Sequence, residues 1–407
     1  MECRFCSAPL ERVFVSLGLA PLSNAYLTPE QLGQTEVFFP LDVYVCDSCL
    51  LVQLPMFEKP ESIFGDYAYF SSYSSSWLKH AERYVDQMIE TLGLTADSMV
   101  VEVASNDGYL LQYFVERGIP VLGIEPAFTV AKAAGERGVP TLEEFFGVAL
   151  ATRLRDEGGS ADLLLGNNVL AHVPDLNDFV AGLGILLKPN GVVTMEFPYL
   201  VRLMEGIQFD TIYHEHFSYF SFLTVGRVFA RHGLTIWDVE ELSTHGGSLR
   251  IFARRDAATG PPVSARVNGL LERERAAGYH DIGHYAGFQA RVDAAKRRIL
   301  EFLITARNEG KTVAGYGAPA KGNTLLNYCG VRTDLLGYTV DRNPYKQGRY
   351  LPGTRIPVYA PERLRQTRPD YVVVLPWNLE TEIVSENAYI RGWGGRFVFL
   401  LPHVRVL

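Results

Sequence analysis

The 407-residue chain has no long hydrophobic run and no excess of positive charge. No apolar stretch approaches the roughly 18–20 residues that a membrane-spanning helix needs, and residues 1–4 lack the apolar core of a signal peptide. The formal net charge of -8 is unfavourable for binding a phosphate backbone. We therefore expect neither a nucleic acid nor a membrane as partner, and a cytoplasmic location. With 47% hydrophobic and 21% charged residues, the composition is typical of a soluble protein with two or three domains.

Cysteine is scarce, with only five residues, and four of them form two Cys-x-x-Cys motifs. Cys3 and Cys6 would share one tight turn, and Cys46 and Cys49 another, which suits tetrahedral zinc. Four sulfurs leave no open position for water, so the site would be structural. Disulfides or unpaired buried cysteines are the alternatives, but disulfides are rare in cytoplasmic proteins. Cys329 stands alone and is expected to be buried.

Apolar segments divide the chain into units. A helical pattern covers residues 76–92, and short apolar strands then alternate with helices, which predicts an α/β fold with parallel sheets. We expect a zinc-binding module at 1–75, an α/β domain at 76–262, a helical linker at 263–308 and a second α/β domain at 309–407. The expected strands are 99–103, 121–124, 163–165, 192–197, an edge strand at 249–253, and 312–316, 336–340, 371–375 and 396–400.

The turn after the first of these strands lacks the glycines of a dinucleotide site. It contains only Gly108, whereas a pyrophosphate needs the bare backbone of a GxGxxG turn. S-adenosylmethionine has no phosphate and needs carbonyl and acidic groups, which Glu102 and Asp107 would supply. Glu125 ends the next strand, where an acid can accept both ribose hydroxyls. The alternative is a capped surface turn beside an unrelated glutamate.

Several motifs together give the chain a family resemblance. The chain resembles the S-adenosylmethionine-dependent C-methyltransferases of nucleotide-linked keto-deoxysugars over nearly its whole length. The resemblance implies an N-terminal zinc-binding module, a central Rossmann-like class I methyltransferase domain and a C-terminal Rossmann-like domain. Some members have glycine where Ala104 stands, and the residue at His214 also varies. The motifs are the two Cys-x-x-Cys pairs and residues 69–75, 102–108, 167–174, 213–217, 245–250, 315–323 and 341–348.

The resemblance also assigns chemistry to the 213–217 motif. A carbon beside a ketone must lose a proton before methylation, which needs a positioned base and a donor for the developing enolate oxygen. The resemblance implies that His216 is the base, and that Tyr213 and Tyr69 polarise the ketone. Glu215 would orient a histidine or return a proton, and His172 would face the same cleft. From spacing alone, the histidines of this motif could instead be metal ligands or structural residues.

The second α/β domain begins with another strand, glycine turn and helix. Lys321 near the helix start suits a diphosphate, and Asp341 ends the following strand like a ribose-binding acid. A lone GxG and the absence of a hydride-transfer set argue against a dinucleotide. We expect this domain to hold the nucleotide part of the substrate, or to be purely structural.

These arguments predict three sets of site residues. The cofactor set is Tyr69, Ser71, Ser74, Glu102, Ala104, Asn106, Asp107, Gly108, Glu125, Pro126, Asn167 and Asn168. The substrate set is His245, Gly317, Lys321, Asn323, Asp341 and Lys346, and the metal set is Cys3, Cys6, Cys46 and Cys49. The expected ligands are S-adenosylmethionine, structural zinc and a sugar nucleotide, with dTDP as the nucleotide. The rival functions are a zinc-ribbon nucleic-acid methyltransferase and a nonenzymatic nucleotide-binding protein.

Overall fold

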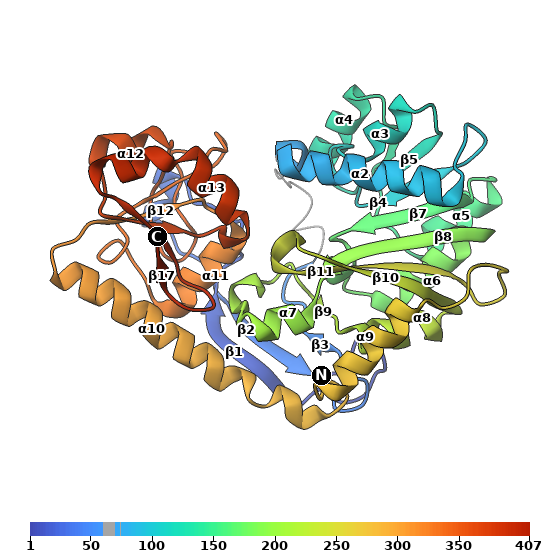
Figure 1. Ribbon diagram of the computed structural model, residues 1–407, viewed down its shortest axis with the longest axis horizontal. Helices are drawn as coiled ribbons and strands as arrows, with labels where there is room; N and C mark the ends of the chain where they lie inside the picture. The colour runs from blue at the N-terminus through green and yellow to red at the C-terminus, as the bar shows by residue number, and fades with distance from the viewer. Residues whose placement is uncertain (60–69, 74) are drawn as a thin grey trace.

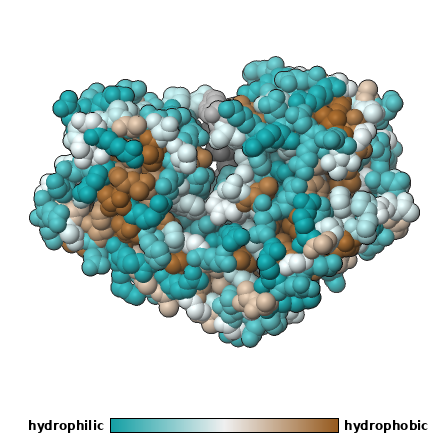
Figure 2. All heavy atoms as spheres, viewed as in Figure 1, coloured by the Kyte–Doolittle hydropathy of each residue, from teal (hydrophilic) through white to brown (hydrophobic). Residues whose placement is uncertain are grey.

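Two α/β lobes face each other across a notch, and a small sheet with a long helix joins them below (Figure 1). The computed structural model describes residues 1–59, 70–73 and 75–407. Figure 2 shows the notch as a hollow between the lobes. No helix within the described ranges has the length and hydropathy of a membrane span.

The N-terminal part forms a four-stranded antiparallel sheet. Its order is β1 (Val13–Ala20), β2 (Phe39–Val45), β3 (Val52–Gln53) and β9 (Ser218–Tyr219). The last strand comes from the middle of the chain, directly after the predicted catalytic segment. The Arg4 guanidinium also donates to the carbonyl of Pro174 at 2.9 Å. The zinc-binding module and the central domain therefore share one sheet.

The central domain is a seven-stranded sheet covered by helices. Five neighbouring strands, β8, β7, β4, β5 and β6, are parallel to one another. Strands β11 and β10 continue the sheet beyond β8 and are antiparallel to their neighbours. All residues of β4 are buried, as expected for a parallel strand covered on both faces. The parallel strands bring their carboxyl ends to one edge, where ligands of such sheets bind. In spatial order, the strands are β10 (Leu234–Leu242), β11 (Ser248–Arg255), β8 (Leu187–Pro198), β7 (Ala161–Asn167), β4 (Val100–Val103), β5 (Val121–Ile124) and β6 (Thr141–Leu142).

The edge of this sheet differs from the prediction. Residues 249–253 lie in β11, between β8 and β10, so their assignment to the sheet edge is wrong. The true edge strand, β10, contains the acidic residues Asp238, Glu240 and Glu241, which hide its strand character in the sequence. The helices of this domain are α2 (Ser75–Leu92), α3 (Leu111–Glu116), α4 (Phe128–Glu136), α5 (Val148–Asp156), α6 (Leu176–Leu186), α7 (Leu200–Glu205) and α8 (Phe222–Arg231).

The C-terminal lobe repeats the same architecture on a smaller scale. Its sheet is parallel except for its last strand. The strands are β14 (Val358–Tyr359), β13 (Thr339–Val340), β12 (Val313–Tyr316), β15 (Tyr371–Val374), β16 (Arg396–Phe399) and β17 (Arg405–Val406). The helices are α11 (Ala320–Cys329), α12 (Glu362–Thr367) and α13 (Glu380–Glu386).

The predicted linker consists of α9 (Ala265–Ala276) and α10 (Phe288–Asn308). Helix α10 is not a free bridge, because it packs along the N-terminal sheet. The rings of Phe288 and Phe14 stack with their centroids 4.6 Å apart. The remaining short helices are η1 (Pro29–Gly33), η2 (Ser71–Tyr73), η3 (Leu170–His172), η4 (Phe209–Thr211), η5 (Thr244–Gly246), η6 (Ile282–Tyr285), η7 (Trp377–Leu379) and η8 (Ala388–Trp393).

Candidate active site and metal centre

Four cysteine sulfurs converge in the N-terminal module. Their Sγ atoms lie within 4.8 Å of one another, and the Cys3–Cys49 and Cys6–Cys46 pairs are each 3.5 Å apart. These separations are far longer than a disulfide bond of about 2.05 Å. They suit sulfurs that each lie about 2.3 Å from one central zinc ion. This geometry fits a closed, structural site with four thiolate ligands.

The two halves of the cluster are built by the same backbone turn. The amide of Ser7 donates to the carbonyl of Cys3, and the amide of Leu50 donates to that of Cys46, both at 2.9 Å. Ser7 and Leu50 both adopt a positive φ, of 59° and 65°. The Gln53 amide donates to the Cys3 sulfur at 3.1 Å, a contact that stabilises a thiolate ligand.

The turn after β4 is fixed by Glu125, the acid that follows β5. The two carboxylate oxygens of Glu125 accept from the amides of Asn106 and Ala127, both at 3.0 Å. Pro126 lies between these two anchors. Burial raises the pKa of Glu125, and the two amides oppose that rise. Each oxygen keeps a further lone pair, which leaves acceptor capacity for ribose hydroxyls.

Two carboxylates lie buried behind this turn. Among the residues that the structure describes, neither oxygen of Glu102 accepts a hydrogen bond of ordinary geometry, and Asp107 Oδ1 has no partner. Burial and the nearby Glu125 and Asp107 raise the pKa of Glu102 well above its usual range, although the Tyr109 hydroxyl lowers it in part. Unpartnered buried acceptors are costly unless a ligand supplies donors. An ammonium group such as that of S-adenosylmethionine would supply them, so the residues present fit this cofactor.

A short segment before α2 covers the same turn. The amide of Ser71 donates to Asn106 Oδ1 at 2.9 Å. Gly108 has a φ of +73°, and an added Cβ would come within 3.1 Å of Val139. Glycine is therefore required there both by conformation and by space. The predicted cofactor residues Tyr69 and Ser74 lie outside the described residues.

The end of β7 joins the predicted cofactor and substrate residues. Asn167 donates to the Tyr109 hydroxyl at 3.4 Å, and Asn168 contacts His245 Nε2 at 3.1 Å. The ring of Trp77 packs edge-on against His245 at 5.1 Å. Burial, with a contribution from the Lys321 charge, lowers the pKa of His245 to about 4. His245 is therefore neutral at physiological pH.

Ala104 provides a test of strain in the turn. It has a φ of 58°, a conformation that costs an L-residue about 1–2 kcal/mol. Ala104→Gly should therefore raise the free energy of unfolding by about 1 kcal/mol, measured by urea denaturation. The control is Ala127→Gly, because Ala127 is buried at an ordinary φ of -84° and should lose about 0.5–1 kcal/mol. Equal destabilisation by both variants would contradict this interpretation.

The predicted base, His216, has a defined position for its ring hydrogen. His216 Nδ1 is 2.7 Å from the carbonyl oxygen of Thr211, and a carbonyl can only accept. Nδ1 therefore carries the hydrogen, and Nε2 presents its lone pair. The His172 and Tyr213 rings lie 4.6 and 3.9 Å from the His216 ring. Burial, followed by the neighbouring His172, holds the pKa of His216 well below its usual range, so the imidazole of His216 is neutral near pH 7.

The neighbours of His216 in the sequence face elsewhere. Glu215 accepts from Asn24 of the N-terminal module at 2.7 Å, and burial raises its pKa to about 7 against the opposing effects of Asn24 and Lys346. His214 contacts the carbonyl of Pro40 at 3.1 Å. His214 and His216 therefore have different surroundings, which is inconsistent with a shared metal ion.

The predicted substrate residues of the C-terminal domain divide into two groups. Lys321 donates to Asn378 at 2.8 Å and lies near enough to His216 and His245 to lower the pKa of both. The others support the fold: Gly317, with a φ of 86°, packs against Pro376. Asp341 accepts from the amides of Ala318 and Asn343, Asn323 donates to Ser23 at 2.6 Å, and Lys346 donates to the Ala318 carbonyl at 2.8 Å.

A buried ion network at the end of β8 was missed by sequence reasoning. Glu196 contacts His80 at 2.9 Å and Arg250 at 2.7 Å, and it accepts from Thr244 at 2.9 Å. Burial alone would raise the pKa of Glu196, but His80 and Arg250 lower it to about 2. The network connects α2 to the turn that carries His245. Its members are far apart in the sequence, and no motif joins them.

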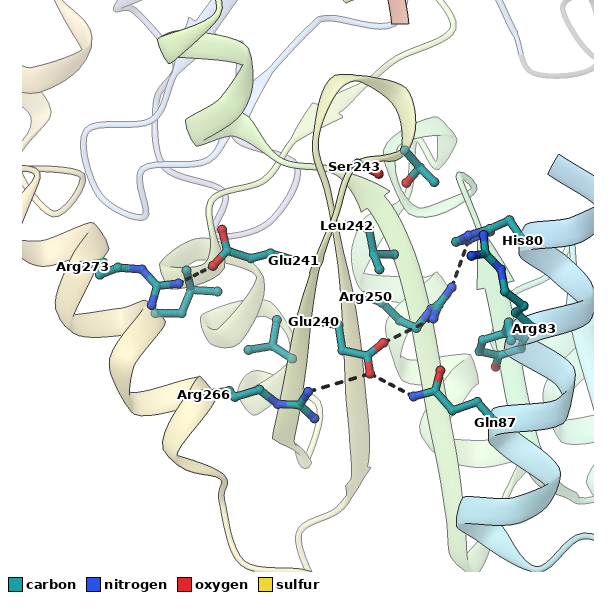
Figure 3. A pocket seen from close by; sticks show the side chains of 14 residues that line it. His80, Arg83, Gln87, Glu240, Glu241, Leu242, Ser243, Arg250, Arg266 and Arg273 are labelled. Atoms are coloured by element: carbon teal, nitrogen blue, oxygen red, sulfur yellow. Dashed lines mark hydrogen bonds and ion pairs between the residues drawn. The ribbon is translucent and has the colours of Figure 1, made fainter. Parts of the chain in front are cut away.

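An open cleft of about 650 Å³ borders this network between α2, β10 and α9 (Figure 3). The acidic side chains of the cleft are already neutralised by neighbouring cations. Glu240 contacts Arg250 at 3.3 Å and lies 3.8 Å from Arg266, while Glu241 pairs with Arg273. We therefore regard the cleft as a structural region of ion pairs beside the candidate site.

Glu196→Gln should destabilise the protein by about 3 kcal/mol at pH 7, because it leaves buried cations unpaired. The pKa of Glu196 is lowered, so its stabilisation is complete above pH 4.5 and is lost as the pH falls towards 2. Urea denaturation at pH 7 and pH 4 should show the difference shrinking. Glu241→Gln is the control. The Glu241 side chain is 37% exposed, so its ion pairs should contribute less than about 1 kcal/mol. Equal losses at pH 7 would contradict the assignment.

Family models match three consecutive parts of the chain. Residues 3–64 match a zinc binding domain, residues 77–239 a methyltransferase domain, and residues 243–402 the C-methyltransferase C-terminal domain. The chain is 38% identical over 406 residues to C-methyltransferase NovU from Streptomyces niveus, a match that covers 100% of this chain and 96% of NovU. The chain belongs to the C-methyltransferase family. Its central domain is an S-adenosylmethionine-dependent methyltransferase domain, and its four-cysteine cluster is a zinc site.

Solved methyltransferase structures were also found. Magnesium protoporphyrin IX methyltransferase (ChlM) from Synechocystis PCC 6803 with bound SAH is 15% identical, with 44% of this chain and 83% of that chain covered and a TM-score of 0.35. An S-adenosylmethionine-dependent methyltransferase from Clostridium acetobutylicum ATCC 824 is 8% identical, with 44% and 92% covered and a TM-score of 0.32.

Proposed function

We propose that this C-methyltransferase methylates a carbon next to the ketone of a nucleotide-linked 4-keto-6-deoxysugar, with dTDP as the nucleotide, in the cytoplasm. The acidic net charge of -8 favours a small substrate over a nucleic acid. The observation that carries the proposal is the neutral His216, whose Nε2 lone pair is available beside Tyr213 and His172.

In this proposal, His216 Nε2 accepts the proton from the carbon beside the ketone. The ketone lowers the pKa of the neighbouring C–H group, but a histidine alone is too weak a base to remove this proton. A hydrogen-bond donor must therefore stabilise the developing enolate oxygen. Tyr213 and Tyr69 are the proposed donors. His172 borders the same space. Methyl transfer to the enolate carbon restores the ketone without a further proton, so the proton taken up by His216 must leave. Burial raises the pKa of Glu215 to about 7, and we propose that it helps His216 lose that proton after transfer.

The proposed cofactor residues within the described ranges lie at the carboxyl edge of the central sheet. When bound, S-adenosylmethionine supplies the methyl group. Glu125 would accept from its ribose, and the unpartnered oxygens of Glu102 and Asp107 would accept from its ammonium group. The remaining proposed contacts are Tyr69, Ser71, Ser74, Ala104, Asn106, Gly108, Pro126, Asn167 and Asn168.

The proposed sugar-nucleotide residues lie on both sides of the notch. Lys321 would neutralise a diphosphate, and His245 would contact the sugar beside Asn168. Gly317, Asn323, Asp341 and Lys346 would shape the C-terminal wall of this site. We also propose that the zinc-binding module spans residues 1–75, the methyltransferase domain 76–262, the helical linker 263–308 and the C-terminal domain 309–407.

The test is to incubate the enzyme with S-adenosylmethionine and a panel of ketosugars linked to dTDP, UDP or GDP in deuterated water. We expect deuterium to enter one carbon beside the ketone, and mass spectrometry to find the new methyl group on that carbon. A duplex RNA and a duplex DNA serve as the competing acceptors. Methylation of a nucleic acid, or no deuterium entry with any ketosugar, would contradict the proposal.

A further inference from the structure

Three consecutive residues of the turn that includes η4 connect the base to the C-terminal domain. The carbonyl of Thr211 accepts the Nδ1 hydrogen of His216. On one side of Thr211, Asp210 accepts from the indole nitrogen of Trp377 at 2.6 Å. On the other side, the carbonyl of Ile212 accepts from the Thr324 hydroxyl of helix α11 at 2.9 Å. The C-terminal domain therefore holds the turn at both neighbours of the residue that orients His216.

These contacts are buried, so water does not compete with them. Asp210 and Ile212 are fully buried, and Thr324 is 2% exposed. Among the described residues, one carboxylate oxygen of Asp210 has no partner, and burial raises the pKa of Asp210 to about 6. The side-chain hydrogen bond that Asp210 accepts from Trp377 comes from the other domain.

Trp377 is itself held in place. A Cβ added at Gly246 would come within 2.4 Å of the indole ring, so the ring packs directly against the His245–Gly246 turn. The ammonium of Lys321 lies 4.8 Å from the indole centroid, a favourable cation–π distance. Because the indole contacts both domains, a displacement of the C-terminal domain would move the η4 turn as well.

The position of the Thr211 carbonyl decides where His216 carries its hydrogen. With this acceptor in place, the hydrogen stays on Nδ1 and Nε2 is a base. Without the Thr211 carbonyl, the imidazole is free to carry its hydrogen on Nε2, and Nε2 then no longer accepts a proton. A small shift of the turn would therefore change the population of the reactive tautomer rather than the shape of the substrate site.

We propose that Trp377 and Thr324 are positioning residues, through which the C-terminal domain keeps His216 in its basic tautomer. This inference rests on the proposed function, in which His216 removes the acceptor proton. It assigns the C-terminal domain a role in the deprotonation step in addition to any binding of the nucleotide.

The variants for the test are Trp377→Phe, which removes the indole N–H and keeps an aromatic ring, and Thr324→Val, which removes the hydroxyl and keeps the side-chain shape. Thr324→Ser keeps the hydroxyl and should rescue the effect. Trp393→Phe is the matched control, because Trp393 donates to the Pro369 carbonyl at 3.0 Å in the same domain, away from η4. The assay follows deuterium exchange into dTDP-4-keto-6-deoxyglucose with S-adenosylhomocysteine present, so that no methyl transfer occurs.

We expect the maximal exchange rate of Trp377→Phe and Thr324→Val to fall about tenfold each, as expected for one lost hydrogen bond. The KM for the sugar nucleotide should change by less than about twofold, because ground-state binding is retained. Nitrogen-15 NMR of histidine-labelled protein, with the His216 signal assigned by His216→Gln, should show a shift away from the Nδ1–H tautomer. Thr324→Ser and Trp393→Phe should match the wild type in both measurements.

The inference would be overturned if Trp377→Phe and Thr324→Val had the same exchange rates and the same His216 tautomer as Trp393→Phe. A rise in KM without a tautomer change would also overturn it, since it would indicate a structural or binding role. In both cases, loss of exchange in His216→Gln would leave the proposed function intact. If His216→Gln itself exchanges at the wild-type rate, the proposed function fails, and this inference fails with it.

Discussion

Cys46→Ser is expected to yield a protein without stoichiometric zinc and with an unfolded N-terminal module. Structural zinc sites contribute about 10–16 kcal/mol of apparent binding free energy, and that energy is available only to the folded site. A serine hydroxyl stays protonated at neutral pH and does not replace a thiolate ligand. The four sulfurs lie within 4.8 Å of one another, so the loss of one opens the closed site to water. Elemental analysis and thermal unfolding would measure both effects.

The control for this prediction is Cys329→Ser. Cys329 is also buried but lies in helix α11 of the C-terminal domain, away from the cluster. This variant should keep its zinc and lose only the packing of one sulfur. A Cys46→Ser protein that retains one zinc ion per chain after dialysis would refute a structural site of four cysteines.

His216→Gln should reduce solvent exchange at the acceptor carbon by about 10²–10⁴-fold, the usual contribution of a positioned general base. Glutamine is neutral and similar in size, so the contacts of the buried pocket should be largely kept. Binding of S-adenosylmethionine, measured by calorimetry, should be unchanged, because the cofactor turn is fixed by Glu125 instead. His214→Gln is the control, since His214 faces Pro40 and should retain most of the exchange rate.

The pH profile provides a second measurement on the same residue. Because the pKa of His216 is lowered, its imidazole stays neutral as the pH falls through the ordinary histidine value of 6.5. The acidic loss of exchange due to His216 should therefore occur below pH 6.5. A loss near pH 7 that disappears in Glu215→Gln would belong to Glu215 instead. Wild-type exchange in His216→Gln would rule out His216 as the base.

The sequence is most informative where a general rule links residue type to position. The apolar run at Val100–Val103 predicts a buried parallel strand, and parallel strands place their following turns at one edge. This rule is sufficient to bring Glu125 next to the turn at Asn106. The cysteine pairs are equally informative, because two such Cys-x-x-Cys motifs are typical of a structural zinc site.

The contacts that the sequence does not reveal join residues far apart in the chain. Asp210 and Trp377 are 167 positions apart, and Glu196 lies 116 positions from His80. Nothing in either local sequence indicates which distant residue these side chains contact. The Thr211–His216 contact spans only five positions, but it uses a backbone carbonyl, and every residue has one. Asp341 directly follows its strand, as expected, yet its carboxylate accepts from the backbone amides of Ala318 and Asn343.

Strand β9 has a consequence for anyone who wishes to recombine these enzymes. The zinc-binding module completes its sheet with Ser218 and Tyr219, which follow the proposed base, His216, by only two and three positions. A chimera that exchanges the first 75 residues alone would pair a foreign β3 with a native β9 and strain the segment that carries His216. The transferable unit is therefore discontinuous: grafts should combine the N-terminal module with residues 209–220 from the same parent.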